Sequence, residues 1–161
     1  MYAPLELPIV HVSVRSSEMI KYASNDFLAL KISYINEIAN FCEIVGADIE
    51  EVARGMGMDR RIGSNFLKAG IGYGGSCFPK DTKALNFQSD HAGVKLKTVK
   101  ATIDVNREQR IKLIDKARRF FPDFRGVRVA IIGLTFKPGT DDLREAPAKQ
   151  NIDILINEGA S

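Results

Sequence analysis

The chain has 161 residues, of which 45% are hydrophobic and 27% charged, and its formal net charge at pH 7 is +3. This is the composition of an ordinary globular protein with enough residues to bury a core. The charges form no long block, which argues against a nucleic-acid-binding surface, and no apolar run is long enough to span a bilayer. Two cysteines do not make a disulfide framework, so we expect a reducing, cytoplasmic location.

The first half of the chain predicts a linker and one long helix. Residues 1–16 carry two prolines and an alternating apolar pattern, which favours an extended linker. A helix follows at 17–45, since Ser16 or Ser17 can cap its first turn and Gly46 is a natural stop. Apolar residues lie nearly all round it, so we expect burial on every side, partly by a second subunit. These positions are Met19, Ile20, Phe27, Leu28, Leu30, Ile32, Ile35, Ile38, Phe41 and Ile44, with Cys42 among them as a core residue.

The remaining elements predict a mainly α fold that ends in an α/β unit. A short helix follows Asp48, which can cap it, and two further helical patterns cover 81–92 and 96–121. An apolar strand is predicted at 127–134, and a helix at 148–158. We therefore expect a central helical domain at 17–121, followed at 122–161 by the first strand-helix unit of a truncated Rossmann-like domain.

The loop from Gly70 to Asp81 carries the most specific chemical signal. Four glycines within 70–75 free the backbone for conformations that side chains forbid. Pro79 places Cys77 just ahead of a helix N-terminus, where free N–H groups and a partial positive charge favour the thiolate. Lys80 adds a formal positive charge. The pattern indicates covalent catalysis by Cys77, while the plainer alternative is a small buried thiol beside a turn.

Three segments carry a resemblance to one family. Gly-Tyr-Gly-Gly-Ser-Cys-Phe-Pro-Lys-Asp, at 72–81, resembles the active-site loop of the UDP-glucose 6-dehydrogenases, which oxidise a sugar alcohol through to a carboxylate. Lys-Tyr-Ala-Ser-Asn, at 21–25, is similar to the segment that supplies an active-site Lys and Asn. Gly-Leu-Thr-Phe-Lys-Pro-Gly-Thr-Asp-Asp-Leu-Arg-Glu-Ala, at 133–146, resembles the start of the family's nucleotide-binding C-terminal domain.

The resemblance implies NAD-dependent, four-electron oxidation of UDP-glucose to UDP-glucuronate through a thiohemiacetal and a thioester on Cys77. It makes Lys21, Asn25 and Asp81 the catalytic partners of Cys77. The implied substrate-binding residues are Lys21, Asn25, Arg61, Phe66, Leu67, Lys68, Ala69, Gly70, Ile71, Gly72, Tyr73, Gly74, Phe136 and Lys137. Lys80 and Arg144 are implied contacts of NAD, and we expect no metal ion.

The resemblance also implies a partner and missing parts. The family dimerises through the helix at 17–45, so we expect a homodimer in which Arg61 reaches the substrate of the neighbouring subunit. No Gly-x-Gly-x-x-Gly turn follows a strand in this sequence. We therefore expect the family's NAD-binding domain and the later strands of its C-terminal domain to be absent, and the chain alone to be inactive.

The residues by themselves allow plainer roles. Asp81 can be the N-cap of a helix that begins there, and Arg61 can form a surface salt bridge. Alternative functions are a GDP-mannose or other nucleotide-sugar 6-dehydrogenase and a non-catalytic dimerisation module. A thiol hydrolase with His11 or His91 as its base is a third alternative, although nothing in the sequence orients either imidazole.

Overall fold

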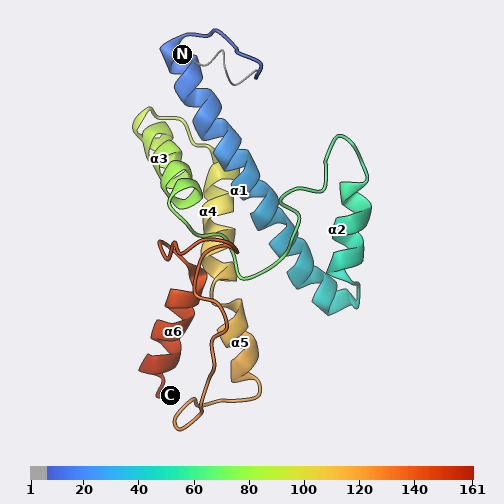
Figure 1. Ribbon diagram of the computed structural model, residues 1–161, viewed down its shortest axis with the longest axis vertical. Helices are drawn as coiled ribbons and strands as arrows, with labels where there is room; N and C mark the ends of the chain where they lie inside the picture. The colour runs from blue at the N-terminus through green and yellow to red at the C-terminus, as the bar shows by residue number, and fades with distance from the viewer. Residues whose placement is uncertain (1–6) are drawn as a thin grey trace.

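The structure, a computed structural model, describes residues 7–161, so the first six residues of the predicted linker lie outside the described part. Figure 1 shows a long diagonal helix, α1, flanked by α3 and α4 on one side and α2 near its C-terminal end. The last two helices, α5 and α6, form a separate pair below them. The helices are α1 (Val14–Val45), α2 (Ile49–Gly57), α3 (Cys77–His91), α4 (Lys97–Gln109), α5 (Lys112–Arg118) and α6 (Pro147–Asn157). The predicted mainly α fold is confirmed.

The long helix α1 forms as predicted, with a slightly earlier start. The side chain of Ser13, rather than Ser16 or Ser17, caps it by accepting a hydrogen bond from the Ser16 N–H. Gly46 ends it in the left-handed conformation, with φ of 75°. With 32 residues, α1 is about 48 Å long, which makes it the axis against which α2, α3 and α4 pack.

Burial of α1 is one-sided within this chain. Ile35 and Cys42 are buried, as predicted for core residues, and the helix packs along α3 and α4. Phe27, Phe41 and Ile44 instead face solvent, so the chain does not cover this helix all round. A polar seam joins α1 to α4, since Ser33 Oγ donates to the Thr102 carbonyl oxygen at 2.9 Å.

The first residues of α2 and α3 can be compared with two predictions about helix N-caps. Asp48 caps α2 as expected, because its side chain accepts hydrogen bonds from the N–H groups of Glu50 and Glu51. Helix α3 begins at Cys77, with Ser76 as its N-cap residue, and not at Asp81. The alternative that made Asp81 an N-cap is therefore wrong: Asp81 lies in the second turn, with its side chain fully buried.

The C-terminal third departs from the sequence prediction in two places. The helix predicted at 96–121 is divided at Arg110, where the chain tightens and the Ile111 N–H donates to the Glu108 carbonyl at 3.3 Å. The strand predicted at 127–134 is not formed. Ser161 forms two backbone hydrogen bonds with this segment. Its N–H donates to the Val127 carbonyl oxygen, and its carbonyl oxygen accepts from the Val129 N–H, which is the pattern of a parallel pair. One paired residue is too little to make a sheet.

A small core holds this third of the chain together. Ile114 of α5, Phe124 and Leu155 of α6 form a buried apolar cluster. Helix α6 begins at Pro147, close to the predicted start, because proline is favoured in the first helical turn. No helix within residues 7–161 combines the length and the apolar character that crossing a membrane requires.

Candidate active site

Asp81 is the centre of a charged cluster between α1 and α3. Its Oδ2 accepts hydrogen bonds from Lys21 Nζ at 2.7 Å and from Asn25 Nδ2 at 2.6 Å. Its Oδ1 accepts one from Lys80 Nζ at 2.6 Å. Lys21 and Asn25 are four residues apart, so both point from the same face of α1. The structure therefore brings two residues of α1 onto a pair in α3 that lies more than fifty positions later in the sequence.

The cluster keeps Asp81 ionised. Burial by itself raises the pKa of a carboxyl group, but the hydrogen bonds from Lys21, Lys80 and Asn25 outweigh it and lower the pKa of Asp81 to about 2. At neutral pH Asp81 is thus an anion and a very weak base. It can hold Lys21 and Asn25 in place and orient water, but it is a poor acceptor for a proton.

Cys77 lies one helical turn before Asp81, on the same side of α3. It is the first residue of the helix, and its thiol is free and exposed. The Cys77 Sγ lies 3.8 Å from Ser76 Oγ. The backbone N–H groups of the first helical turn lack intrahelical partners, so the sulfur sits at the positive end of the helix dipole. An accessible nucleophile therefore borders a Lys–Asn–Asp cluster.

The glycine-rich loop before Cys77 is held by side chains that the sequence analysis did not single out. Asn36 of α1 accepts from the Gly70 N–H at 2.7 Å, and Asn106 of α4 accepts from the Tyr73 N–H at the same distance. At Gly72, with φ of 96°, a Cβ would lie 2.7 Å from Asn106 Oδ1. The glycine thus permits both the left-handed backbone and the close approach of Asn106.

A cavity of about 300 Å³ opens beside this loop. It unites residues predicted to bind substrate with Ile32 of α1 and Phe78 of α3. The lining residues are Ile32, Phe66, Lys68, Gly72, Tyr73, Gly74, Phe78, Phe136 and Lys137. Phe78 packs against the rings of Phe66 and Tyr73, with centroids 6.0 Å and 5.9 Å away. Lys137 Nζ lies 5.3 Å from the centre of the Phe136 ring. Aromatic walls with two lysines suit a flat ring that carries anionic groups.

Other predicted substrate residues lie outside this cavity. Leu67 is buried, so only its backbone could meet a ligand. Ala69, Gly70 and Ile71 do not line the cavity. Arg61 is 88% exposed and forms an ion pair with Asp59 at 2.6 Å. The plainer prediction of a surface salt bridge at Arg61 is therefore confirmed within this chain.

The two predicted NAD contacts come from α3 and from the segment before α6. Lys80 follows Cys77 on α3, and Arg144 accepts a hydrogen bond from the Gly75 N–H through its carbonyl oxygen at 2.8 Å. Hydrogen bonds to the Asp142 carboxylate raise the pKa of Arg144. Both cations are largely exposed, which suits contact with the phosphates of a dinucleotide.

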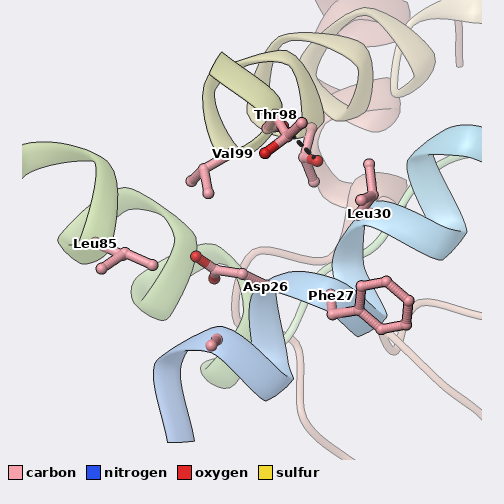
Figure 2. Close-up of a pocket in the computed structure, with 8 residues that line it drawn as sticks. Asp26, Phe27, Leu30, Leu85, Thr98 and Val99 are labelled. Carbon is pink, nitrogen blue, oxygen red and sulfur yellow. Dashed lines mark hydrogen bonds between the residues drawn. The ribbon is translucent and has the colours of Figure 1, made fainter. Parts of the chain in front are cut away.

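A second carboxyl group beneath the cluster escaped the sequence analysis. Asp26 is 7% exposed, and neither of its oxygens has a hydrogen-bond partner. Figure 2 shows it pointing from α1 toward Leu85 of α3 and the start of α4, into a pocket of about 190 Å³. Burial and, second, the charge of Asp81 raise the pKa of Asp26 to about 6. Its sequence signal was a carboxylate on the helix face that carries Ala23 and Leu30.

The chain matches two family models. Residues 15–108 match the central domain of the UDP-glucose/GDP-mannose dehydrogenase family. Residues 130–161 match the UDP binding domain of the same family. The first match alone covers more than half of the chain.

Known proteins agree with these matches. Two UDP-glucose 6-dehydrogenases of Bacillus subtilis, YwqF and TuaD, are 57% identical over 92% of this chain and 49% identical over 99% of it. The chain spans 34% and 35% of their lengths. A UDP-glucose dehydrogenase from Pyrobaculum islandicum superimposes with a TM-score of 0.95 and 38% identity, covering 99% of this chain and 37% of that one. The chain therefore belongs to the UDP-glucose/GDP-mannose dehydrogenase family.

Proposed function

We propose that this chain supplies the catalytic cysteine and much of the nucleotide-sugar site of an NAD-dependent UDP-glucose 6-dehydrogenase, which oxidises UDP-glucose to UDP-glucuronate. The observation that carries the proposal is the convergence of Lys21, Asn25 and Lys80 on Asp81, one helical turn from Cys77. The names of the relatives support UDP-glucose as the substrate.

The aromatic cavity beside the loop supports the placement of the nucleotide. Phe66, Tyr73 and Phe136 offer ring faces for a base, and Lys68 and Lys137 offer cations for a diphosphate. The loop backbone at 72–74 adds polar groups for the remaining hydroxyls. In this arrangement the sugar extends from the cavity toward Cys77.

In the first oxidation, Lys21 and Asn25 bind the C6 oxygen of the sugar. NAD, when bound, supplies the chemistry of hydride acceptance in both oxidations, and Lys80 and Arg144 are this chain's candidates for holding it. The hydroxyl proton leaves to water, because Asp81 is too weak a base to keep it and instead orients that water and Lys21. The product of this step is an aldehyde at C6.

The Cys77 thiolate then forms a C–S bond to the aldehyde carbon, and the carbonyl oxygen becomes an oxyanion that Lys21 and Asn25 stabilise. Loss of the second hydride from this thiohemiacetal gives a thioester. Water oriented by Asp81 attacks the thioester, the C–S bond breaks, and Cys77 leaves as a thiolate. Covalent attachment keeps the aldehyde from escaping between the two oxidations.

Turnover is tested in a chimaera in which this chain replaces the matching third of B. subtilis YwqF. We expect two NADH for each UDP-glucuronate formed from UDP-glucose, and little turnover of GDP-mannose. Preference for GDP-mannose would overturn the substrate assignment. A folded chimaera that binds UDP-glucose but forms no NADH would support the non-catalytic alternative instead.

We also propose that two copies of the chain associate through α1. Ile20, Phe27, Tyr34 and Phe41 recur every seven residues along α1, and their exposed fractions lie between 47% and 62%. A solvent-facing heptad stripe of this length is typical of helices that pack against another helix. In such a dimer the exposed Arg61 is available to the substrate of the neighbouring subunit, as the family resemblance implies.

Sedimentation equilibrium of the chain tests this association. We expect a dimer for the unaltered chain and a monomer for Phe27→Asp and Phe41→Asp. Phe87→Asp is the matched control, because Phe87 is also exposed but lies on α3, and it should leave the dimer intact. A folded monomer of the unaltered chain at high micromolar concentration would contradict the proposal.

The family matches at 15–108 and 130–161 support a division into a central helical domain at 17–121 and the start of a UDP-binding domain at 122–161.

Both cysteines are free thiols, which supports a reducing compartment such as the cytoplasm. Calorimetric titration of UDP into the chain tests the binding cavity separately from catalysis.

A further inference from the structure

The aromatic cavity beside the glycine-rich loop has walls from two distant parts of the chain. One wall is the loop at 72–74, within the residues that match the central domain. The other is formed by Phe136 and Lys137, within the residues that match the UDP binding domain. Ligand cavities are usually largely formed before the ligand arrives. The contacts that join the two walls therefore decide whether this cavity is ready for a ligand.

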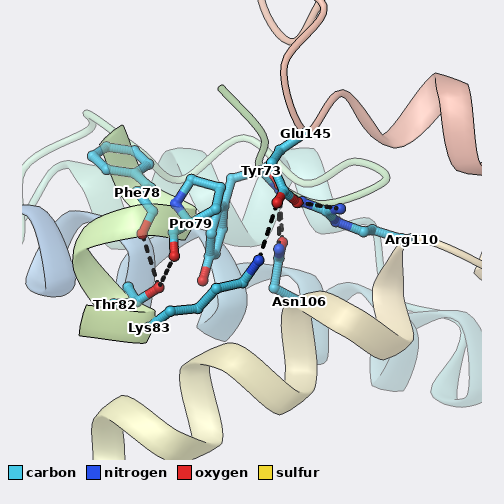
Figure 3. A network of polar contacts seen from close by, with 8 residues as sticks. All are labelled: Tyr73, Phe78, Pro79, Thr82, Lys83, Asn106, Arg110 and Glu145. Carbon is cyan, nitrogen blue, oxygen red and sulfur yellow. Dashed lines mark hydrogen bonds and ion pairs between the residues drawn. The ribbon is translucent and has the colours of Figure 1, made fainter. Parts of the chain in front are cut away.

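Arg110 connects the two walls, as Figure 3 shows. Its Nη2 donates a hydrogen bond to the Tyr73 carbonyl oxygen of the loop at 2.9 Å. Its Nη1 forms an ion pair with Glu145 Oε2 at 3.3 Å, and Glu145 belongs to the 136–146 segment that carries the second wall. A planar guanidinium has several N–H donors, so one side chain can hold acceptors on two segments at once. Neither Arg110 nor Glu145 lines the cavity, so both act on it only through its walls.

The backbones of the two walls meet at the same place. The Gly75 N–H donates to the Arg144 carbonyl oxygen at 2.8 Å. A Cβ at Gly74 would lie only 2.3 Å from the Glu145 carbonyl oxygen, and a Cβ at Gly75 would lie 2.8 Å from the Phe136 ring. Glycines at these two positions therefore permit the close contact between the walls, and the Gly75 amide reports whether that contact is formed.

Arg110 also lies at the joint between the two parts of the chain. It is the C-cap residue of α4, where the predicted 96–121 helix is divided, and α5 beyond it packs against α6. Its side chain is 13% exposed, so its two contacts are partly shielded from water and stronger than the same contacts would be on the surface. Lys83 attaches Glu145 to α3, whereas Arg110 binds both Glu145 and the loop.

We propose that Arg110 is a positioning residue for the aromatic cavity: by holding the Tyr73 carbonyl oxygen and the Glu145 carboxylate at once, it keeps the loop against the 136–146 segment. Without its guanidinium the two walls separate more often, and the cavity is incomplete in a larger fraction of molecules. The inference rests on the proposed placement of the nucleotide in this cavity. It requires nothing of the chemistry at Cys77.

The test variant, Arg110→Gln, removes the charge and the bridge between the walls and should still fold. The Tyr73 carbonyl oxygen keeps its hydrogen bond from Asn106 Nδ2 at 3.2 Å. Glu145 keeps its ion pair with Lys83 at 3.1 Å. The substitution therefore leaves neither the carbonyl nor the carboxylate without a partner.

Amide hydrogen exchange of the unliganded chain tests the joint itself. We expect Arg110→Gln to speed exchange at the Gly75 amide by about tenfold, the size of effect that loss of one hydrogen bond to a charged group exerts. Amides in the middle of α3 should keep their rates. A general loss of stability would instead speed exchange at both places.

Calorimetric titration of UDP into the chain tests the consequence for the cavity. We expect Arg110→Gln to bind UDP at least about threefold more weakly, because apparent affinity falls with the fraction of molecules whose walls are together. Arg110→Lys keeps the charge but lacks the planar fork, so it should be weakened nearly as much. Arg107→Gln is the matched control and should change neither measurement, because Arg107 is exposed one turn earlier and pairs with Asp104 of the same helix at 3.1 Å.

Kinetics of the YwqF chimaera separate positioning from a loss of active protein. Arg110→Gln should raise KM for UDP-glucose while kcat at saturating substrate stays within about twofold, because Arg110 does not contact the cluster around Asp81. A merely destabilised chimaera would lose kcat instead.

The inference fails if folded Arg110→Gln keeps the unaltered exchange rate at Gly75, or if it binds UDP as tightly as the unaltered chain. It also fails if Arg110→Lys has full UDP affinity, since charge and not the bridge would then matter. If the unaltered chain binds no UDP, the proposed placement of the nucleotide is wrong, and exchange at Gly75 still decides whether Arg110 joins the two segments.

Discussion

Asp26 offers the sharpest thermodynamic prediction, because its carboxyl group is buried without a partner. The substitution is Asp26→Asn, which keeps the shape and removes the charge. The pKa of Asp26 rises from an ordinary 3.8 to about 6 in the folded chain, a difference worth about 3 kcal/mol. A carboxyl whose pKa is raised by folding binds more protons in the folded state, so stability falls as the pH rises from about 4 to 6.

We therefore expect Asp26→Asn to be more stable than the unaltered chain by about 2–3 kcal/mol at pH 8. At pH 4, where Asp26 is largely protonated in the folded chain, the two should differ by less than about 0.5 kcal/mol. Urea unfolding followed by far-ultraviolet circular dichroism at several pH values measures both free energies of unfolding. Asp153→Asn is the matched control, since that carboxyl is exposed on α6, and it should match the unaltered chain throughout.

The reasoning is refuted if Asp26→Asn and the unaltered chain are equally stable at pH 4 and pH 8. It is equally refuted if the unaltered chain gains stability relative to Asp26→Asn as the pH rises. Either result would mean that Asp26 finds a partner that the structure does not show, and that burial does not control its protonation.

Two further predictions concern the loop and the charged cluster. Gly74→Ala should lower the melting temperature of the chain by several degrees because its Cβ has no room, whereas Gly70→Ala, with nothing within 4 Å, should be nearly neutral. For Asp81, a pKa lowered by folding from 3.8 to about 2 contributes about 2 kcal/mol at neutral pH that is lost as the pH falls toward 2. The stability difference between Asp81→Asn and the unaltered chain, measured by urea unfolding, should therefore shrink on acidification, and a constant difference would contradict the assignment.

Local sequence signals were enough to predict several elements correctly. Gly46 and Asp48 marked the end of α1 and the start of α2 because capping is decided by neighbouring residues. The loop at 70–81 was singled out because its glycines, cysteine and lysine are adjacent in sequence. The prediction of a strand at 127–134 was wrong because a strand must pair with a neighbouring strand, and a local sequence pattern does not show whether one is present.

Long-range contacts account for what the sequence analysis missed. Asn106 and Gln109 of α4 hold the loop, although they lie more than thirty residues from it in the sequence. Asn106 Oδ1 accepts a hydrogen bond from the Tyr73 N–H, and Gln109 Nε2 donates one to the Gly70 carbonyl oxygen, both at 2.7 Å. The predicted all-round burial of α1 combined two different faces. Ile35 is part of the chain's own core, whereas the stripe containing Phe27 is exposed. Only the packing of α3 and α4 against α1 decides which of the two faces is buried.

The central claim is that Cys77 forms the covalent bond to the sugar. The direct measurement is UDP-glucuronate formation by the YwqF chimaera carrying Cys77→Ala, with Cys42→Ala, the other cysteine, as the control. We expect Cys77→Ala to lose acid formation by several orders of magnitude while calorimetry still detects UDP-glucose binding, and Cys42→Ala to retain activity. Formation of the acid by Cys77→Ala at the rate of the unaltered chimaera would contradict the account.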